Sequence, residues 1–183
     1  YPNGISTTFV TSTDGSGQLI PVPIAERVQA DMRTIGVDMK IEATEWVSYF
    51  TKWISGGFKD KGAAQMSFGA PDPFWLEQTI GCTFFVGEVG GLNTGYYCNP
   101  KVDEIMKAAR HAPPPSPGDP YAAWGLSEQA VKLWSKANQM ATEDAALMLV
   151  LSDKNPFVYN KRVRGKVQTA LEWFTFRTMW LAA

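Results

Sequence analysis

Few side chains in this chain could support acid–base or nucleophilic chemistry. The only histidine, His111, lies beside a proline-rich segment, so a Ser-His-Asp or Cys-His arrangement has no evident partner. Four carboxylates could lie near a common pocket, namely Glu45, Asp72, Glu77 and Glu88. Asp72 precedes a proline in a turn, where an aspartate more often bonds to its own backbone. The residues therefore favour a non-enzyme, and a small carboxylate-dependent hydrolase is the alternative.

Metal, cofactor and nucleic-acid binding also find little support in the sequence. Two cysteines and one histidine make a poor zinc set, and no G-x-x-x-x-G-K-[ST] loop is present. We therefore expect no metal and no cofactor. The formal net charge is −1 with acidic and basic residues mixed, which gives no footprint for nucleic acid. No apolar run approaches the roughly 20 residues that span a bilayer, so we do not expect the chain to cross a membrane.

Aromatic residues offer another kind of chemistry. The chain has 7 Trp, 6 Tyr and 10 Phe, and rings combined with a few polar groups suit stacking on apolar or sugar-like ligands. Several rings lie on segments that should converge near one strand edge: Trp46, Trp53, Phe68, Phe74, Trp75, Tyr96 and Tyr97. Core packing is the competing explanation, and it is favoured for Trp53 and Phe50 on a helix face. For Trp46 both remain open. An aromatic surface could also serve a free-standing interaction module.

The stretch from Gln65 to Val102 joins these features. A short apolar run is stopped by Gly69 and Pro71, as in a strand that ends in a turn, and a Gly-rich loop follows. Cys82 and Cys98 lie at the two ends of this loop. A disulfide between them would contribute about 3 kcal/mol and would suit an oxidising compartment such as a periplasm, whereas two separate buried thiols are the alternative.

The elements that must position these residues begin with a βαβαβ pattern. Strands are predicted over residues 5–12, 37–43 and 63–68, with helices over about 24–35 and 44–54 between them. Such units place the strands parallel with right-handed crossovers, and ligands gather at the carboxyl ends of the strands. The expected fold class is α/β, a βαβαβ-based mixed sheet flanked by helices, forming a single lobe over residues 1–183.

The second half predicts helices more than strands. Asn99 can cap a helix that starts at Pro100. The proline-rich residues 111–120 read as an exposed spacer, and a long helix is predicted from about Ala122 to Glu143. The apolar run of residues 146–152 predicts a strand buried on both faces. An extended segment over residues 156–163 and an aromatic tail complete the chain.

The order of motifs resembles a known family. The chain opens with YPNG, followed by QADMRTIGVDMKIEATEW, then GAPDPFWLE, then LNTGYYCNPKVDEIMKAAR, a long helix, an apolar strand and an aromatic tail. This succession is similar to the C-terminal lobe of the family 5 extracellular solute-binding proteins, the peptide, nickel and opine type receptors of ATP-driven importers. The resemblance covers nearly the whole chain and rests on five motifs in order.

The resemblance implies a two-lobed receptor that closes on its ligand. The chain would be one lobe in a fold of the periplasmic-binding-protein type, with the other lobe preceding Tyr1 and an ABC transporter permease as partner. The location implied is periplasmic or extracellular, including the cell envelope. The ligand would be a small peptide-like, opine-like or sugar-like molecule. Matching motif positions imply these ligand-binding residues: Trp46, Met66, Ser67, Phe68, Gly69, Asn93, Tyr97 and, with a one-residue slip, Tyr96.

One position departs from the family pattern. Peptide-binding members place an aspartate four residues before the proline of the turn, where it pairs with the α-amino group of the peptide. Here that position, counted from Pro73, is Gly69. A buried ammonium without a counter-charge costs several kcal/mol. We therefore expect this protein not to bind peptides through a free N-terminus.

Overall fold

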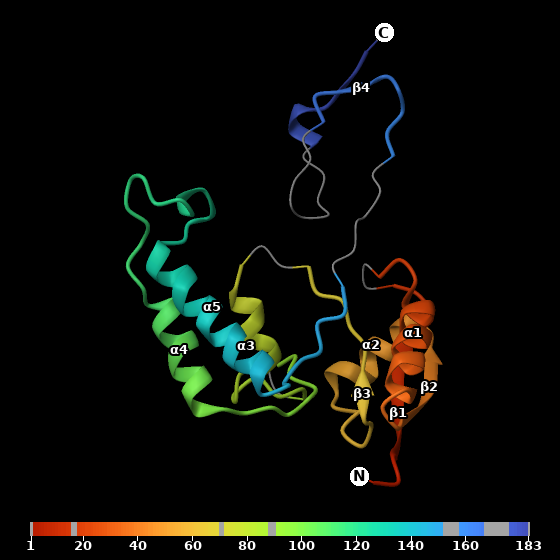
Figure 1. The fold of residues 1–183 in the computed structure, drawn as a ribbon. Helices are drawn as coiled ribbons and strands as arrows, with labels where there is room; N and C mark the ends of the chain where they lie inside the picture. The colour runs from red at the N-terminus through yellow and green to blue at the C-terminus, as the bar shows by residue number, and fades with distance from the viewer. Residues whose placement is uncertain are drawn as a thin grey trace.

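The structure is a computed structural model that describes residues 2–15, 18–69, 72–87, 91–151, 158–166 and 176–182. The first part of the chain, which we call the sheet unit, contains β1 (Ile5–Ser12), α1 (Pro21–Arg33), β2 (Val37–Thr44), α2 (Trp46–Ile54) and β3 (Ala63–Ala64). The second part, the helical unit, contains α3 (Phe74–Ile80), α4 (Pro100–Arg110) and α5 (Glu128–Glu143). Figure 1 shows the two units lying beside each other.

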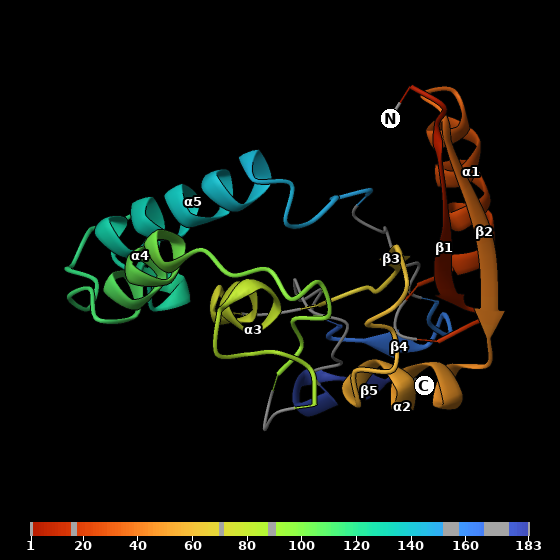
Figure 2. The ribbon, with the colours of Figure 1, turned by 90° about the horizontal axis from the view of Figure 1, so that it is seen from below.

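The sheet unit confirms the predicted βαβαβ arrangement. Its three strands are parallel in the order β2-β1-β3, and Phe9 of β1 pairs with Ile41 of β2 and Ala63 of β3. Successive side chains of a strand point to opposite faces. Phe9 accordingly packs with Ala25 of α1 on one face, while Val10 packs with Trp53 of α2 on the other. Figure 2 shows α1 lying along the sheet and α2 crossing the carboxyl end of β2.

The third strand is shorter than predicted. Pairing with β1 covers Ala63 and Ala64, and the Gln65 N–H still donates to Val10 O at 3.0 Å. Residues 65–69 then belong to no strand. Met66 still packs on the cluster around α2, as Ala64 does, so the chain keeps the same face inward after its pairing with β1 ends.

Small residues allow the helices of the helical unit to approach closely. Ala109 of α4 and Ala130, Ala137 and Ala141 of α5 are buried in one cluster, together with Met106. Helix α4 begins as predicted, since the Asn99 side chain accepts a hydrogen bond from the Lys101 N–H at 3.1 Å and Pro100 follows. The compact packing of α4 on α5 therefore rests on alanine at the contact positions.

The predicted long helix over 122–143 is divided in two. A 3₁₀ turn covers Ala122–Trp124, and Gly125 then adopts φ +72°, a left-handed conformation that ends the turn. Ser127 restarts the chain as α5 by accepting a hydrogen bond from the Ala130 N–H at 3.2 Å. The prediction missed this break because the apolar spacing continues through it. Between α4 and α5, residues 111–120 form neither helix nor strand and are mostly exposed.

The predicted buried strand over residues 146–152 is wrong for residues 146–151, and Ser152 lies outside the described residues. Residues 147–151 form neither helix nor strand, and their exposed fractions run from 38% for Leu147 to 73% for Leu149. A strand needs a neighbour for its backbone hydrogen bonds. In the described part of the chain none pairs with this run, so its apolar side chains remain on the surface.

The C-terminal residues form a separate small pair of strands. β4 (Val163–Arg164) pairs antiparallel with β5 (Trp180–Leu181), and a 3₁₀ turn covers Phe176–Thr178. This pair belongs to a different sheet from β1–β3, and in Figure 1 it lies apart from both units. The predicted extended segment over 156–163 falls partly on residues 156 and 157, which lie outside the described residues; residues 158–160 form neither helix nor strand.

Candidate functional site

The candidate site lies at the carboxyl ends of the strands. Helix α2 follows β2 directly, and residues 65–69 follow β3. Because β2 and β3 lie on opposite sides of β1, the direction of the connections reverses between β1 and β3. In open α/β sheets a crevice at this switch point is where ligands bind. From the sheet topology we therefore expect a ligand site beside α2 and the chain that follows β3.

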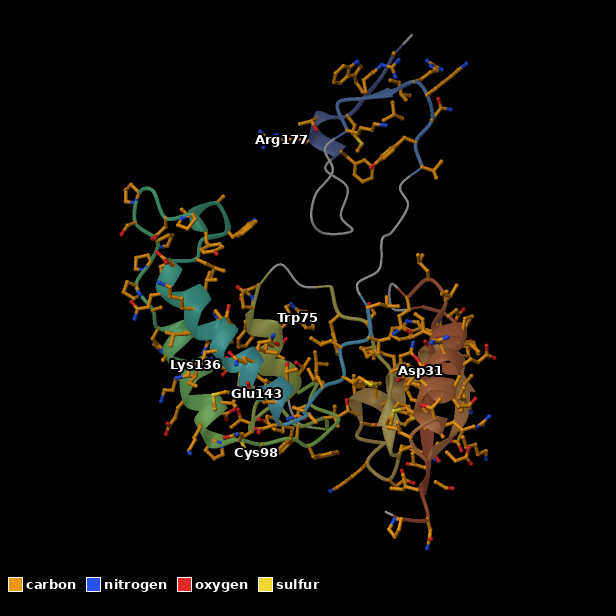
Figure 3. The ribbon with its side chains drawn as sticks, in the orientation of Figure 1. Asp31, Trp75, Cys98, Lys136, Glu143 and Arg177 are labelled. Carbon is orange, nitrogen blue, oxygen red and sulfur yellow. A yellow bond between two sulfur atoms is a disulfide. The ribbon has the colours of Figure 1, made fainter. Side chains whose placement is uncertain are left out.

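A series of ring contacts crosses this edge. We call it the aromatic wall, and it consists of Trp46, Tyr49, Trp53, Phe68 and Trp75. Tyr49 lies 6.3 Å from Trp46 and 6.0 Å from Trp53 between ring centroids. Phe68 lies 6.2 Å from Trp53 and 6.1 Å from Trp75. The wall thus links α2 to α3, and Figure 3 shows Trp75 on the side of α3 toward the sheet unit.

Tyr49 is the residue that the sequence analysis did not assign to the site. Its ring is fully buried, and its hydroxyl donates a hydrogen bond to the Gln65 carbonyl oxygen. Burial raises the pKa of the Tyr49 hydroxyl well above its usual value of 10, so it remains a donor at neutral pH. Tyr49 thereby ties the chain after β3 to α2. Its spacing could have indicated this role, since it lies three residues after Trp46 and four before Trp53.

Two buried polar atoms of the sheet unit lack a hydrogen-bond partner among the described residues. One is Nε1 of Trp53, and the other is Oε1 of Gln65. The amide nitrogen of Gln65 is occupied, since it donates to the Gln18 side chain and to Pro21 O. A buried donor or acceptor without a partner costs about 1–3 kcal/mol. Such atoms are uncommon in the cores of native proteins, and these two lie close to the end of β3.

Residues 66–69 follow β3 toward the aromatic wall. Met66 and Ser67 are half-buried, whereas Phe68 and Gly69 are exposed. A Cβ atom built on Gly69 would meet no atom within 4 Å among the described residues. The position therefore has room for a larger side chain. Steric crowding does not explain why it carries no carboxylate.

Trp46 lies at the first turn of α2, half-buried. Its ring lies 5.2 Å from Phe50, and its atoms lie so close to Gly15 that a Cβ there would be 2.4 Å from the indole. Gly15 also has φ +83°, so a side chain at this position is excluded twice over. The indole thus packs on the loop after β1 while keeping part of its surface open, a position suited to a ligand contact.

The structure separates the three loop residues implied by the resemblance. Asn93 is 1% exposed, and its amide donates to Gly81 O at 3.0 Å and to Tyr97 O at 2.8 Å. Tyr97 packs on the helical unit, and its hydroxyl donates to Asp144 at 2.5 Å. Tyr96 instead packs on the cluster around α2. The ligand-binding role of these three residues stays a prediction. In this structure the Asn93 side chain forms hydrogen bonds to backbone groups.

The environment of Tyr97 and Tyr96 differs in charge. Burial, with the Asp144 carboxylate beside it, raises the pKa of Tyr97 to about 12. Tyr96 lies 5.5 Å from the Phe85 ring, and the Lys59 ammonium lies 5.0 Å above its centroid. The face of the Tyr96 ring therefore contacts a cation, and Tyr96 packs on the same cluster as the aromatic wall.

The two cysteines form the predicted disulfide. Cys82 and Cys98 are bonded, with their Cα atoms 4.5 Å apart, and no described cysteine is free. The bridge joins the end of α3 to the residue before Asn99, which caps α4. It therefore closes the loop that carries Asn93 and Tyr96.

Two of the carboxylates considered for catalysis, Glu45 and Asp72, bind backbone N–H groups of the residues that follow them. Glu45 caps α2 by accepting hydrogen bonds from Val47 N at 2.8 Å and Ser48 N at 3.1 Å, and these bonds lower the pKa of its carboxyl. Asp72 accepts a hydrogen bond from Phe74 N at 2.8 Å, so the predicted bond to its own backbone is confirmed. Glu88 lies outside the described residues.

Glu77 is the one buried carboxylate of the group. Burial raises the pKa of Glu77, while Arg110, whose Nε lies 3.3 Å from the carboxylate, opposes the shift. It faces α4 in the helical unit, where the Arg110 side chain also lies over the Phe74 ring. Glu77 is thus paired inside the helix packing and does not line the aromatic wall.

Other kinds of site are not seen in the described part of the chain. Among those residues no group of three or more His, Cys, Asp or Glu is placed to hold a metal ion. The helices described there include none with the length and apolar character that a membrane crossing requires.

Comparison with known proteins shows a likeness of fold. No protein-family model matches the chain, and no curated protein matches it. Solved structures do match the chain. A dipeptide-binding protein from Pseudoalteromonas sp. SM9913, in complex with Met-Leu, is 18% identical with a TM-score of 0.67, and the match covers 100% of this chain and 33% of that one.

Two further neighbours share the fold. The periplasmic binding protein DppA from Helicobacter pylori, in complex with the peptide STSA, is 21% identical with a TM-score of 0.64, covering 99% of this chain and 32% of that one. NikZ from Campylobacter jejuni, in complex with Ni(L-His), is 18% identical with a TM-score of 0.62, covering 87% and 29%. The chain therefore shares its fold with part of each of these binding proteins, and it spans about one third of their length.

Proposed function

We propose that this chain is the C-terminal ligand-binding lobe of a family 5 solute-binding protein that serves an ABC importer. The supporting observation is the aromatic wall at the switch point of the sheet, in a fold shared over the whole chain with a dipeptide-binding protein. Rings on one lobe provide contact area for a ligand that a second lobe then encloses. The protein would act in the periplasm or outside the cell, and its partner would be the importer permease.

Binding would use the exposed faces of Trp46 and Phe68 together with backbone groups of residues 66–69. One lobe supplies part of the contacts, and closure on the second lobe supplies the rest. We therefore expect the present chain alone to bind a solute far more weakly than an intact receptor. Equal affinities of the two by isothermal titration would contradict this.

The ligand class follows from the missing carboxylate at Gly69. A peptide with a free N-terminus would place an ammonium beside a wall of rings without a counter-charge, which costs several kcal/mol. A peptide-like ligand with a blocked amine, or an opine-like or sugar-like molecule, does not carry this penalty. We propose such a ligand for this site.

The test uses the intact receptor and its Gly69→Asp and Gly69→Asn variants. Since a Cβ at Gly69 meets no described atom within 4 Å, both side chains should fit. The Asp variant should gain affinity for Met-Leu by about tenfold or more, because a charged hydrogen bond contributes about 1.5–3 kcal/mol, and the Asn variant should not. Micromolar binding of free dipeptides by the wild-type protein would overturn the ligand class.

A further inference from the structure

We infer that Tyr96 is a positioning residue of the candidate site: it holds the helical unit on α2 and thereby keeps Trp75 in contact with Phe68 in the aromatic wall. The inference rests on the proposed function, because it assigns a role within that site. It differs from the direct ligand contact that the resemblance implies for Tyr96, since here Tyr96 acts through the wall. Tyr96 belongs to the loop between Cys82 and Cys98, described for residues 82–87 and 91–98, which we call the bridged loop.

The bridged loop is anchored in the helical unit at its base. Its two ends are joined by the disulfide, and the Cys82 N–H donates to the Asp103 carboxylate of α4 at 3.2 Å. The Leu92 N–H donates to the Gln78 carbonyl oxygen of α3 at 3.1 Å. The disulfide and these bonds to both helices make the loop a fixed extension of α3 and α4.

The far end of the bridged loop packs on the sheet unit. The Gly87 N–H donates to the Ile54 carbonyl oxygen, at the C-terminal end of α2, at 2.9 Å. Among the described residues, the apolar clusters of the sheet unit include two members from beyond residue 72, Val86 and Tyr96, and both belong to this loop. Val86 is 5% exposed, so its side chain is buried in the cluster around α2. The bridged loop is therefore a link between α2 and the helical unit.

Tyr96 has neighbours on both sides of this link. Its ring lies 5.5 Å from the Phe85 ring of the same loop, while the Lys59 ammonium of the sheet unit lies 5.0 Å from its centroid. A Cβ at Gly56, just after α2, would be 2.9 Å from the Tyr96 hydroxyl, so the absence of a side chain there admits the phenol. The ring thus meets residues of both units.

The backbone of Tyr96 is held in an unfavourable conformation. Its φ is +51°, a region that a bulky residue rarely adopts and that costs energy. Such a conformation persists where the surrounding contacts impose it. The turn sends adjacent side chains to different units, because Tyr96 packs on the cluster around α2 while the Tyr97 hydroxyl donates to Asp144, just after α5. The strained residue thus lies where the chain joins the two units.

The aromatic wall depends on how the two units are placed. Phe68 lies 6.2 Å from Trp53 in the sheet unit and 6.1 Å from Trp75 on α3. The first contact is internal to the sheet unit, whereas the second joins it to the helical unit. Without the Tyr96 ring the bridged loop would lose part of its contact with α2, and α3 could shift away from Phe68. A ligand that spans the wall would then meet a smaller ring surface.

The test follows the contact between Phe68 and Trp75 by fluorine NMR. The chain has 7 Trp, and labelling with 5-fluorotryptophan gives each a resonance that single tryptophan-to-phenylalanine variants assign. The test variant is Tyr96→Gly, because glycine adopts a φ of +51° without strain, so the ring is removed while the turn remains. The Trp75 resonance should move toward its position in Phe68→Leu, where the ring contact is absent. An unchanged Trp75 resonance would overturn the inference.

Two further variants separate positioning from a general loss of stability. Tyr96→Phe retains the ring and should keep the Trp75 resonance at its wild-type position; a shift as large as that of Tyr96→Gly would contradict a role for the ring. Tyr121→Ala is the matched control, because Tyr121 is also half-buried and has a ring neighbour, Trp124 at 6.0 Å, in the segment that precedes α5. It should leave the Trp75 resonance unchanged. If it moves that resonance as much as Tyr96→Gly does, Tyr96 is not a positioning residue.

A milder variant covers the case in which Tyr96→Gly does not fold. Tyr96→Leu retains an apolar side chain but has no ring to receive the Lys59 ammonium or to contact Phe85. The Trp75 resonance should move in the same direction by a smaller amount. No movement in the folded Tyr96→Leu variant would also contradict the inference.

The effect on binding is measured with the intact receptor and N-acetyl-Met-Leu, a dipeptide whose amine is blocked. By isothermal titration, Tyr96→Gly should weaken binding by about three- to tenfold, whereas Tyr96→Phe should change it by less than about twofold, because an aromatic contact is worth about that first factor. Unchanged affinity would contradict the role of Tyr96 in the site. Weaker binding with an unchanged Trp75 resonance would mean that Tyr96 contacts the ligand itself, which also overturns the inference.

These outcomes are distinguishable from failure of the proposed function. An intact receptor that binds neither N-acetyl-Met-Leu nor another solute, while the Trp75 resonance of the chain moves in Tyr96→Gly, would contradict the solute-binding role and support the link between the units. A receptor that binds N-acetyl-Met-Leu while the Trp75 resonance stays unchanged would support the proposed function and overturn the inference.

Discussion

The sheet unit and the helical unit are built from different side chains. In the helical unit, alanines at the contacts of α4 and α5 bring the helices together, with Trp134 as the large buried ring. In the sheet unit, the cluster under α2 consists largely of rings, including Tyr49, Trp53 and Phe58. Small residues give a closed contact between two helices. Rings give large area and leave edges at the surface, which suits a face that meets another molecule.

The two units also differ in how their buried polar groups are satisfied. Asn93 beside the helical unit has its side-chain amide fully engaged with backbone groups of Gly81 and Tyr97. Trp53 in the sheet unit has a buried N–H without a partner among the described residues. The helical unit also has one such atom, Oε2 of Glu77, but there the Arg110 Nε lies 3.3 Å away and supplies an opposite charge. Substitutions at Asn93, the disulfide and Glu77 probe the helical unit, and a matched pair at Trp53 and Trp134 compares the two units directly.

The largest effect is expected for Asn93→Ala. Three hydrogen bonds would be lost, two from the Asn93 amide and one from Tyr97 N to Oδ1 at 3.3 Å, and buried backbone groups would lack partners. The free energy of unfolding should fall by about 3–5 kcal/mol. Urea denaturation followed by circular dichroism measures it. The exposed Asn138→Ala on α5 is the control and should change stability by about 0.5 kcal/mol or less.

Removal of the disulfide should have the next largest effect. The double variant Cys82→Ser, Cys98→Ser opens a loop with a sequence separation of 16, for which the chain-entropy model gives about 3 kcal/mol. Asn93 holds the same loop in the folded state, so we expect the variant to fold. The free energy of unfolding of the double variant should match that of the wild-type protein after reduction with dithiothreitol. A variant that loses its near-ultraviolet signal entirely would contradict this.

A matched pair of tryptophan changes tests the comparison directly. Trp53→Phe removes an indole N–H that is buried without a partner, so the relief of about 1–3 kcal/mol offsets the lost contact area. Trp134→Phe removes an N–H that is not in this situation and should therefore be more destabilising, by about 1 kcal/mol or more. Thermal unfolding of both variants gives the difference. Equal losses would mean that the two units are equally complete.

The smallest effect concerns pH and Glu77. Because burial raises the pKa of folded Glu77 above its usual 4.5, the folded state binds this proton more tightly than the unfolded state. The contribution of Glu77 to stability is therefore fully present below pH 4.5 and is lost as pH rises through the raised pKa. Relative to Glu77→Gln, the wild-type protein should lose stability as the pH rises above 4.5, as thermal melts would show. Arg110→Gln should make this loss steeper, since Arg110 opposes the shift.

Local signals in the sequence were enough for much of the fold. Strand β1 spans the predicted residues 5–12, and the parallel βαβαβ order follows from alternating periodicities that the side chains of each element set by themselves. Asn99 and Pro100 marked the start of α4 correctly, because capping depends on adjacent residues. The cysteines at the two ends of one loop indicated the disulfide, since chain closeness makes that pairing short-range.

Tertiary contacts decided the rest. Periodicity could not tell that the apolar residues 147–151 would lie on the surface, because burial depends on whether a partner strand is present. Nor could it separate Tyr97 from Tyr96, which are adjacent in sequence but pack on different units. The positive φ of Tyr96, +51°, turns the chain between them. What the sequence determined was the order of strands and helices in the sheet unit and the start of α4, which depend on local signals. Which rings form the aromatic wall was set by distances between segments that only the folded chain brings together.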